Sequence, residues 1–253
     1  MSVSKAAKSR QLEPPVALVT GGARRIGAAI VRQLHARGCS VIIHYLGSAG
    51  DAHALAAELN ADRPDSAKTI QGDLVTRDGP DQLAGQVAEL TDSLAVLVNN
   101  ASRFYPTPVG DITPEQWKDL MGSNLRGPFF LSQALVPLLR GGAIINIADI
   151  YSQRPLPGHT VYCMAKAGVE MMTRSMALDL APDVRVNAVS PGAILWPEGE
   201  TGEGDPQDIL SRVAMGRLGD PGDIASAVAY LGLDAPYVTG QVLAVDGGRS
   251  LNV

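Results

Sequence analysis

Short, continuously apolar runs alternate along this chain with longer segments that have helical periodicity. The first run covers residues 16–20, and a glycine-rich turn separates it from Ile26, Ile30 and Leu34, which have a helical spacing. We expect further strands at residues 40–44, 67–71, 94–98, 143–148, 184–189 and 242–245. Because their apolar residues follow one another without alternation, these strands are expected in a parallel sheet that is buried on both faces.

Helical segments connect the expected strands. They cover residues 26–38, 49–60, 79–92, 114–139 with a break near Gly127-Pro128, 157–180 and 221–231. This alternation predicts one α/β domain, residues 15–253, with a doubly wound parallel sheet of about seven strands and helices on both faces. Residues 1–14 are polar and are expected to form a flexible tail. Residues 193–206 lack usable periodicity, and we expect either a mobile lid or a surface loop there.

Composition and charge exclude several classes of partner. The chain has 253 residues, of which 45% are hydrophobic and 19% charged, as in ordinary globular proteins. A net charge of −5 offers no basic surface for nucleic acid, and no apolar run reaches the length of a membrane span. Cys39 and Cys163 match no zinc-site spacing, so we expect free thiols, no metal and a cytoplasmic protein.

The turn from Gly21 to Gly27 joins the first strand to a helix, as a phosphate-binding turn requires. Glycine lets the backbone approach a pyrophosphate, and the free amides of the helix N-terminus meet its charge. Asn100 and its neighbours close the fourth expected strand at the carboxyl edge of the sheet, where parallel sheets bind ligands.

Tyr162 and Lys166 are four residues apart in the helix expected at 157–180, so both side chains lie on one helix face. A phenol titrates near ~10, and an ammonium within ~4–6 Å favours the phenolate and lowers that pKa. The pair can therefore act as a general acid. Asp149 directly follows the fifth expected strand. The alternatives are a core tyrosine beside a solvated lysine, and an Asp149 that only caps a helix.

These residues together resemble the short-chain dehydrogenase/reductase superfamily over nearly the whole chain. The motifs that carry the resemblance are Thr20-Gly21 through Gly27, Asp73, Asn99-Asn100-Ala101, Asn124, Tyr162-x-x-x-Lys166, Pro191-Gly192 and Asp246-Gly247-Gly248. The resemblance implies a Rossmann-type fold that binds a nicotinamide cofactor. It also implies that Tyr162 donates a proton, that Lys166 holds the nicotinamide ribose, and that Asn124 supports a proton relay.

At two positions this chain departs from most members of the superfamily and is similar to the pteridine reductases within it. Asp149 stands where most members have serine, and Arg25 where most have glycine. Residues 100–108 and His44-Tyr45 also resemble that subfamily. The resemblance implies a substrate site in which Phe104 stacks on a pterin and Asp149 assists Tyr162 in protonation. The implied substrate-binding residues are Arg25, Ser102, Phe104, Asp149 and Tyr162. An alternative is that Phe104 only anchors its loop, and we expect Arg103 to lie on the surface.

The second expected strand ends without the carboxylate that binds the ribose of NAD, whereas Arg24 and Arg25 stand in the turn, so NADPH is favoured. Pteridine reductases often have an arginine where this chain has Gly47. Phosphate binding is therefore expected to depend on Arg24, His44 and Ser48. The alternative for His44 is a simple strand-end histidine. The full set predicted to bind cofactor is Gly21, Arg24, Arg25, Ile26, His44, Tyr45, Ser48, Asp73, Leu74, Asn100, Ala101, Ser102, Asn124, Tyr162, Lys166, Pro191 and Gly192.

The sequence therefore predicts an NADPH-dependent reductase of dihydropterin or dihydrofolate rings, with Asp149, Tyr162 and Lys166 as catalytic residues. A carbonyl reductase of the same superfamily, acting on a ketoacyl or sugar substrate, is the first alternative. The second is a non-catalytic protein that senses NADP. The resemblance also implies a homotetramer built through the long helices and the C-terminal segment.

Overall fold

A seven-stranded parallel sheet lies at the centre of the computed structural model, which describes residues 15–194 and 206–251. The strand order is β3-β2-β1-β4-β5-β6-β7, which confirms the predicted doubly wound sheet. The winding reverses between β1 and β4, which is where open sheets of this kind bind ligands. The strands are β1 Val16–Val19, β2 Ser40–Tyr45, β3 Ala67–Gln71, β4 Val96–Asn99, β5 Ala143–Ile147, β6 Arg185–Pro191 and β7 Val242–Val245.

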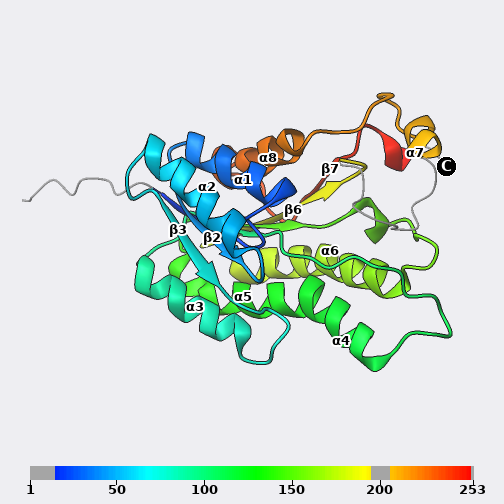
Figure 1. Cartoon of the computed structure of the whole chain (residues 1–253), viewed down its shortest axis with the longest axis horizontal. Helices are drawn as coiled ribbons and strands as arrows, with labels where there is room; N and C mark the ends of the chain where they lie inside the picture. Colours follow the sequence, from blue (N-terminus) through cyan, green and yellow to red (C-terminus); the bar gives the residue numbers. More distant parts are fainter. Residues whose placement is uncertain (1–14, 195–205, 252–253) are drawn as a thin grey trace, which may run out of the picture.

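Helices cover both faces of the sheet (Figure 1). One layer contains α1 Arg25–Ala36, α2 Ala49–Asp62 and α8 Pro221–Ala229. The other contains α3 Gly79–Leu90, α4 Pro114–Met121, α5 Gly127–Leu135 and α6 Thr160–Leu180. A short helix, α7 Pro206–Ser211, lies near the C-terminal end of the described chain and was not predicted. Among the described residues, no helix combines the length and apolarity that crossing a membrane requires.

Alternate residues of each strand pack into two separate hydrophobic cores, because neighbouring side chains of a strand point to opposite faces of the sheet. Leu18, Leu97 and Ile144 pack towards α3, α5 and α6. Val19 and Ile145 pack towards α1 and α8. All five are fully buried, and burying a side chain of this size contributes about 1.5–3 kcal/mol. The continuous apolar runs of the sequence therefore reflect a sheet covered on both sides.

The long helical region is interrupted earlier than predicted. α4 ends at Met121, one π-helical turn covers Gly122–Arg126, and α5 follows directly. Pro128 has no amide hydrogen to donate to the carbonyl four residues before it, so the hydrogen-bond pattern changes ahead of the proline. The widened turn contains Asn124, whose Nδ2 donates to the carbonyl oxygens of Leu120 and Arg103 at 2.9 Å each. The interruption thus connects α4 to the loop that follows β4.

Other predicted boundaries shift by a few residues. The helix expected at 157–180 begins at Thr160, and the strand expected at 94–98 begins at Val96. The predicted tail, residues 1–14, and most of the predicted loop at 193–206 lie outside the described residues.

Candidate active site

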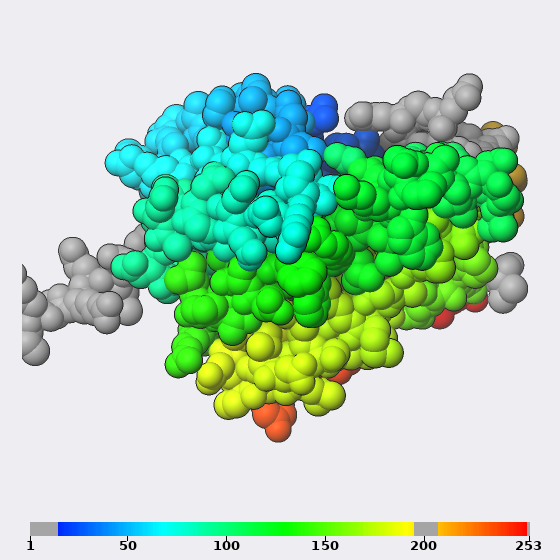
Figure 2. Space-filling model, turned by 90° about the horizontal axis from the view of Figure 1, so that it is seen from below, coloured from blue at the N-terminus to red at the C-terminus, as the bar shows by residue number. Residues whose placement is uncertain are grey.

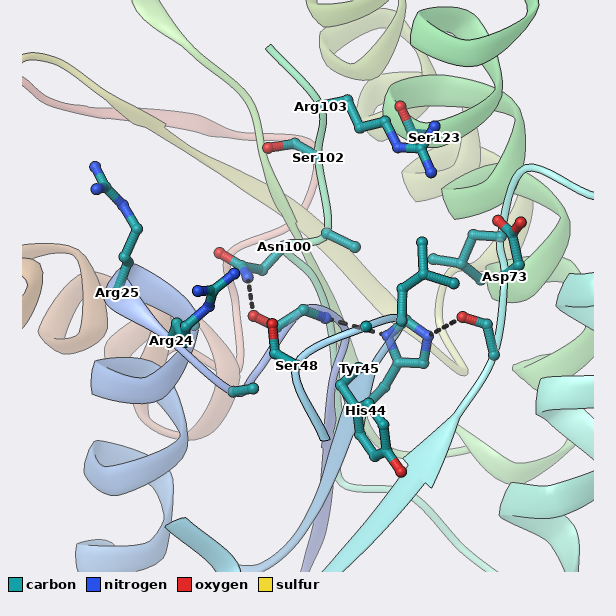
Figure 3. Close-up of a pocket in the computed structure, with 18 of the residues that line it drawn as sticks. Arg24, Arg25, His44, Tyr45, Ser48, Asp73, Asn100, Ser102, Arg103 and Ser123 are labelled. Atoms are coloured by element: carbon teal, nitrogen blue, oxygen red, sulfur yellow. Dashed lines mark hydrogen bonds between the residues drawn. The ribbon is translucent and has the colours of Figure 1, made fainter. Parts of the chain in front are cut away.

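A line of hydrogen bonds crosses the base of the pocket at the carboxyl edge of the sheet (Figure 3). Asn100 Nδ2 donates to Gly21 O at 3.0 Å, and Gly21 N donates to His44 Nδ1 at 3.1 Å. His44 Nε2 lies 3.1 Å from Gly72 O. Asn100, Gly21 and Gly72 follow β4, β1 and β3, and His44 belongs to β2. The line therefore holds the ends of four neighbouring strands together.

The turn after β1 fits a dinucleotide pyrophosphate. Gly21 has a φ of +60°, which favours glycine, and a Cβ added to Gly27 would lie 2.1 Å from Gly21 O. A side chain at either position would collide with the turn itself or with Asn100 and Ala101, so glycine lets the turn close tightly at the N-terminus of α1, where free amides favour an anion. The chain thus has the cradle that a nicotinamide dinucleotide requires.

A pocket of about 380 Å³ opens above this turn, a size typical of small-molecule sites. Its wall contains twelve of the residues predicted to bind cofactor: Gly21, Arg24, Arg25, Ile26, His44, Tyr45, Ser48, Asp73, Leu74, Asn100, Ala101 and Ser102. Residues from the ends of four strands therefore meet around one cavity, although they are up to 81 residues apart in sequence.

His44 does not have the geometry predicted for a phosphate ligand. It is 2% exposed, and both ring nitrogens are used within the protein. Because Nδ1 accepts from Gly21, the proton lies on Nε2, which donates to Gly72 O. Burial lowers the pKa of His44 to about 4, against weaker opposing effects of the Gly72 hydrogen bond and Asp73. The structure supports the alternative, a neutral strand-end histidine.

Arg24 and Arg25 lie on the side of the pocket away from Asp73 (Figure 3). Both side chains are exposed, and Arg24 Nε lies 3.6 Å from an oxygen of Asp51. Arg25 has a φ of +52°, a left-handed conformation that costs about 1–2 kcal/mol for a residue with a Cβ. A conformation of this kind is often retained at a binding site.

Asp149, Tyr162 and Lys166 meet beside the carboxyl end of β5. The Tyr162 hydroxyl donates to Asp149 Oδ2 at 2.6 Å, and Tyr151 N donates to Oδ1 at 2.9 Å. Asp149 therefore caps the short helix Ile150–Ser152 and binds Tyr162 at the same time. Lys166 is 3% exposed, donates to Ile147 O at 2.8 Å, and has its nitrogen 5.6 Å from the centre of the Tyr162 ring.

Burial dominates the electrostatics of this cluster. It raises the pKa of Asp149, while hydrogen bonds from Tyr151 and Tyr162 and the charges of Lys166 and Arg249 lower it. Burial lowers the pKa of Lys166 to about 8, although the Asp149 charge acts in the opposite direction. A protonated Asp149 is therefore easier to form than in water, while Lys166 still carries substantial charge near neutral pH.

The loop after β4 links the pocket to this cluster. Phe104 packs its ring against Tyr162, with centroids 4.8 Å apart and the planes at 79°. Arg103 is partly exposed, as expected of a surface residue, and it also lines the pocket and is paired with Asp119. Tyr105 also donates to Asp119, at 3.0 Å. These contacts place Phe104 between the cofactor pocket and Tyr162.

Three other predicted cofactor residues lie at the edges of the site. Asn124 contacts the backbone of Arg103, and its Oδ1 is buried without a hydrogen-bond partner among the described residues. Pro191 ends β6, and the backbone amide of Gly192 donates to Val245 O at 3.1 Å. None of the three lines the main pocket.

Sequence reasoning missed two side chains near the cluster. His159 stacks on Phe104, and its position three residues before Tyr162 was a signal that helical spacing could have used. Arg249 Nη2 donates to Tyr151 OH at 2.9 Å from the far end of the chain. No local pattern in the sequence connects Arg249 with Tyr151.

The neutral His44 makes folding stability depend on pH. In the unfolded chain His44 binds a proton below its ordinary pKa of 6.5, whereas in the folded chain it does so only below a pKa of about 4. Stability therefore falls as pH falls through this window, by up to about 3 kcal/mol. We expect His44→Gln to lose about 1–3 kcal/mol at pH 7, because a buried hydrogen bond is broken, but to show a shallower acid decline.

Urea unfolding at a series of pH values measures both effects. His53→Gln, which changes an exposed histidine, should keep the slope of the unsubstituted protein. Equal slopes for His44→Gln and the unsubstituted protein would contradict this account.

Comparisons with known proteins agree with this geometry. The family described as "Enoyl-(Acyl carrier protein) reductase" matches residues 21–250. Pteridine reductase 1 of Leishmania tarentolae is 39% identical over 280 aligned residues, which cover 94% of this chain and 96% of that protein. The 3-oxoacyl-(acyl-carrier-protein) reductase of Staphylococcus aureus is 36% identical over 238 residues, 92% of this chain and 96% of that protein. The chain therefore belongs to the short-chain dehydrogenase/reductase family and is an oxidoreductase that uses a nicotinamide cofactor.

Proposed function

We propose that this protein is an NADPH-dependent pteridine reductase that reduces dihydropterin or dihydrofolate-type rings to the tetrahydro level. The observation that carries the proposal is the 2.6 Å contact between the Tyr162 hydroxyl and Asp149. By resemblance, most members of the superfamily have serine at that position, whose hydroxyl suits a carbonyl oxygen. A carboxyl group beside the phenol suits a ring nitrogen that must gain a proton. The similarity to pteridine reductase 1 supports the same assignment.

The cluster provides the proton that reduction of a C=N bond requires. When bound, reduced nicotinamide supplies the hydride, and the electron pair of the broken π bond then resides on nitrogen. Tyr162 donates its proton to that nitrogen, and the adjacent Lys166 charge stabilises the resulting phenolate. Asp149, whose pKa burial raises, takes up a proton from water and passes it to the Tyr162 phenolate across their 2.6 Å contact, so the hydrogen bond then runs from Asp149 to Tyr162. The buried Asn124 Oδ1 is an acceptor suited to hold a water that resupplies the cluster.

The substrate site is proposed to lie between the cofactor pocket and Tyr162. A pterin is flat and carries several ring nitrogens, so stacking and a few directed polar groups can hold it. Phe104 provides the stacking surface, and Asp149 and Tyr162 provide the polar groups. Arg25 and Ser102, which line the adjoining pocket, are proposed to contact both cofactor phosphate and substrate.

Reduction of a ketoacyl group is the second candidate function. The observation that favours it is the 36% identity to 3-oxoacyl-(acyl-carrier-protein) reductases, which extends over almost the full length of both chains. A carbonyl substrate would use the same Tyr162 and Lys166 but would have no need for a carboxyl group at Asp149.

One panel of substrates separates the two candidates. NADPH oxidation by the purified protein is measured with dihydrobiopterin, dihydrofolate, an acetoacetyl ester and a quinone. We expect pterin turnover that falls by about 10²–10⁴-fold in Tyr162→Phe and in Asp149→Ser, because each loses a positioned proton donor. Cofactor binding should be retained.

The matched controls are Tyr230→Phe and Asp62→Ser, which make the same changes at exposed positions of other elements. They should keep full turnover. An enzyme that reduces the acetoacetyl ester but no pterin, or an Asp149→Ser variant with normal pterin turnover, would rule out the pteridine assignment.

The preference for NADPH rests on charge at the adenosine end of the pocket. β2 ends in Tyr45, and no carboxylate occurs in residues 45–48 that could bind a ribose 2′-hydroxyl. Arg24, Arg25 and Ser48 line the pocket and are proposed to hold the 2′-phosphate, and Asp73, on the opposite side from the two arginines, is proposed to contact the adenine. His44 contributes by fixing the turn and not by contacting phosphate.

Binding measurements test the cofactor preference. We expect the protein to bind NADPH at least about tenfold more tightly than NADH, and Arg24→Ala to weaken NADPH about 10- to 100-fold while changing NADH little. Calorimetry gives both dissociation constants. Arg37→Ala, which removes a surface arginine paired with Asp234, serves as the control. Equal affinities for the two cofactors would refute the role given to Arg24 and Arg25.

A homotetramer is proposed from exposed apolar side chains on the helices of one layer. Leu178 and Met171 of α6 are 83% and 63% exposed, and Phe129 and Phe130 of α5 are also partly exposed. In Figure 2, α4 and α5 (green) and α6 (yellow-green) form much of the visible surface. Apolar groups gathered in this way mark protein contacts. The free thiols of Cys39 and Cys163 are compatible with the proposed cytoplasmic location.

Light scattering tests the assembly. Four chains of 26.5 kDa predict a particle of about 106 kDa. Leu178→Glu should reduce the mass, because a charge cannot be buried in an apolar contact. A mass of one chain for the unsubstituted protein would exclude the tetramer.

A further inference from the structure

Phe104 is covered on one ring face by His159. The two rings are nearly parallel, with an interplanar angle of 12° and centroids 4.6 Å apart. Tyr162 meets the same phenylalanine at a steep angle, 79°, with centroids 4.8 Å apart. His159 and Tyr162 are three residues apart, so one helix end presents both rings to Phe104.

His159 is held rigidly in this position. Its ring is 1% exposed, and Nδ1 lies 2.9 Å from Pro157 O, so Nδ1 carries a proton and donates it. The backbone of the Phe104 loop is fastened beside it, because Thr107 N donates to Gly158 O at 2.5 Å. Neither the imidazole nor the loop can therefore tilt freely.

The second nitrogen of His159 has no structural task among the described residues. Nε2 is buried and has no hydrogen-bond partner there. Leaving such an atom unpaired costs about 1–3 kcal/mol. A leucine would fill the same space without that cost. What His159 offers that a leucine would not is therefore a flat ring at a fixed angle, and that ring faces Phe104.

Covering one face of Phe104 restricts where a flat ligand can stack. A ligand ring can use only the opposite face, and the Tyr162 ring, set at a right angle, marks the end of the slot that carries the proton donor. A backing ring that cannot move fixes the tilt of Phe104 and hence the width of this slot. A fixed tilt of Phe104 does not strengthen the binding of a flexible acyl chain, whereas it does strengthen the stacking of a bicyclic heteroaromatic ring.

We propose that His159 is a positioning residue that sets the plane of Phe104 and thereby makes the site selective for flat heteroaromatic substrates. This inference rests on the proposed pteridine reductase function and extends it, since it assigns substrate selectivity to a residue that cannot reach the substrate itself. The stacked order is His159, then Phe104, then the substrate ring.

Two substitutions of similar size separate a stacking role from simple filling. His159→Leu fills the space with an apolar side chain that is not flat, and His159→Phe restores a flat ring without either nitrogen. We expect His159→Leu to raise the KM for dihydropterin about threefold to tenfold, the loss expected for one aromatic stacking arrangement. His159→Phe should stay within about twofold of the unsubstituted enzyme.

Further measurements on His159→Leu, together with a control variant, identify the cause of any change. The dissociation constant of oxidised pterin, read from its fluorescence, should rise with KM in His159→Leu, while kcat and NADPH affinity remain unchanged. The KM for an acetoacetyl ester should not move. His35→Ala, a substitution at a buried histidine of α1 bonded to Ser66, controls for general loss of stability and should leave the KM for dihydropterin unchanged.

The outcomes separate this inference from the proposed function. Pterin turnover by the unsubstituted enzyme with an unchanged KM in His159→Leu would overturn the role of His159 alone. Equal defects in His159→Leu and His159→Phe would do the same, because flatness would then be irrelevant. No pterin binding or turnover by the unsubstituted enzyme would overturn both proposals together.

Discussion

A parallel sheet buried on both faces allows polar chemistry only at its edges, and this constraint organises the whole molecule. The strands are nearly continuous apolar runs, so side chains within the sheet are used for packing. Polar residues gather where the strands end: the glycine turn after β1, Asn100 after β4 and Asp149 after β5. α6 then returns beside β5 and brings Tyr162 to Asp149. Residues far apart in sequence meet because all their strands point the same way.

Buried polar contacts align these strand ends with one another. Below Asn100, Asn99 Nδ2 donates to Asn146 Oδ1 at 2.8 Å, and Asn146 Nδ2 donates to Thr173 Oγ1 at 2.9 Å. This chain of bonds connects β4, β5 and α6 beneath the catalytic cluster. The line from Asn100 through Gly21 and His44 does the same beneath the cofactor pocket. Such bonds have strict geometry, so they fix the relative heights of the strands better than apolar packing alone.

The sequence was sufficient for the fold and the main clusters, because both depend on local patterns. Continuous apolar runs predicted the sheet, and the spacing of Tyr162 and Lys166 predicted that both lie on one helix face. The partnership of Asp149 with Tyr162 was implied by the family resemblance and not by spacing. The sequence was misleading for His44, because the sequence around a strand-end histidine is the same whether its side chain points to a ligand or into the protein. The pairing of Arg103, which lies in the loop after β4, with Asp119 of α4 could not be predicted because no local pattern connects the two residues. The packing of His159 on Phe104 depends on how a loop folds over a helix end, which no periodicity describes.

The left-handed backbone at Arg25 places opposing demands on this position. Glycine would adopt that conformation with ease, yet it would remove one of the three arginines that line the pocket. Selection for thermal stability alone would therefore favour replacing Arg25 by glycine, whereas selection for affinity towards a phosphorylated ligand would keep the arginine. A substitution at this single position would thus trade stability of the fold against affinity for the ligand, while the rest of the scaffold stays the same.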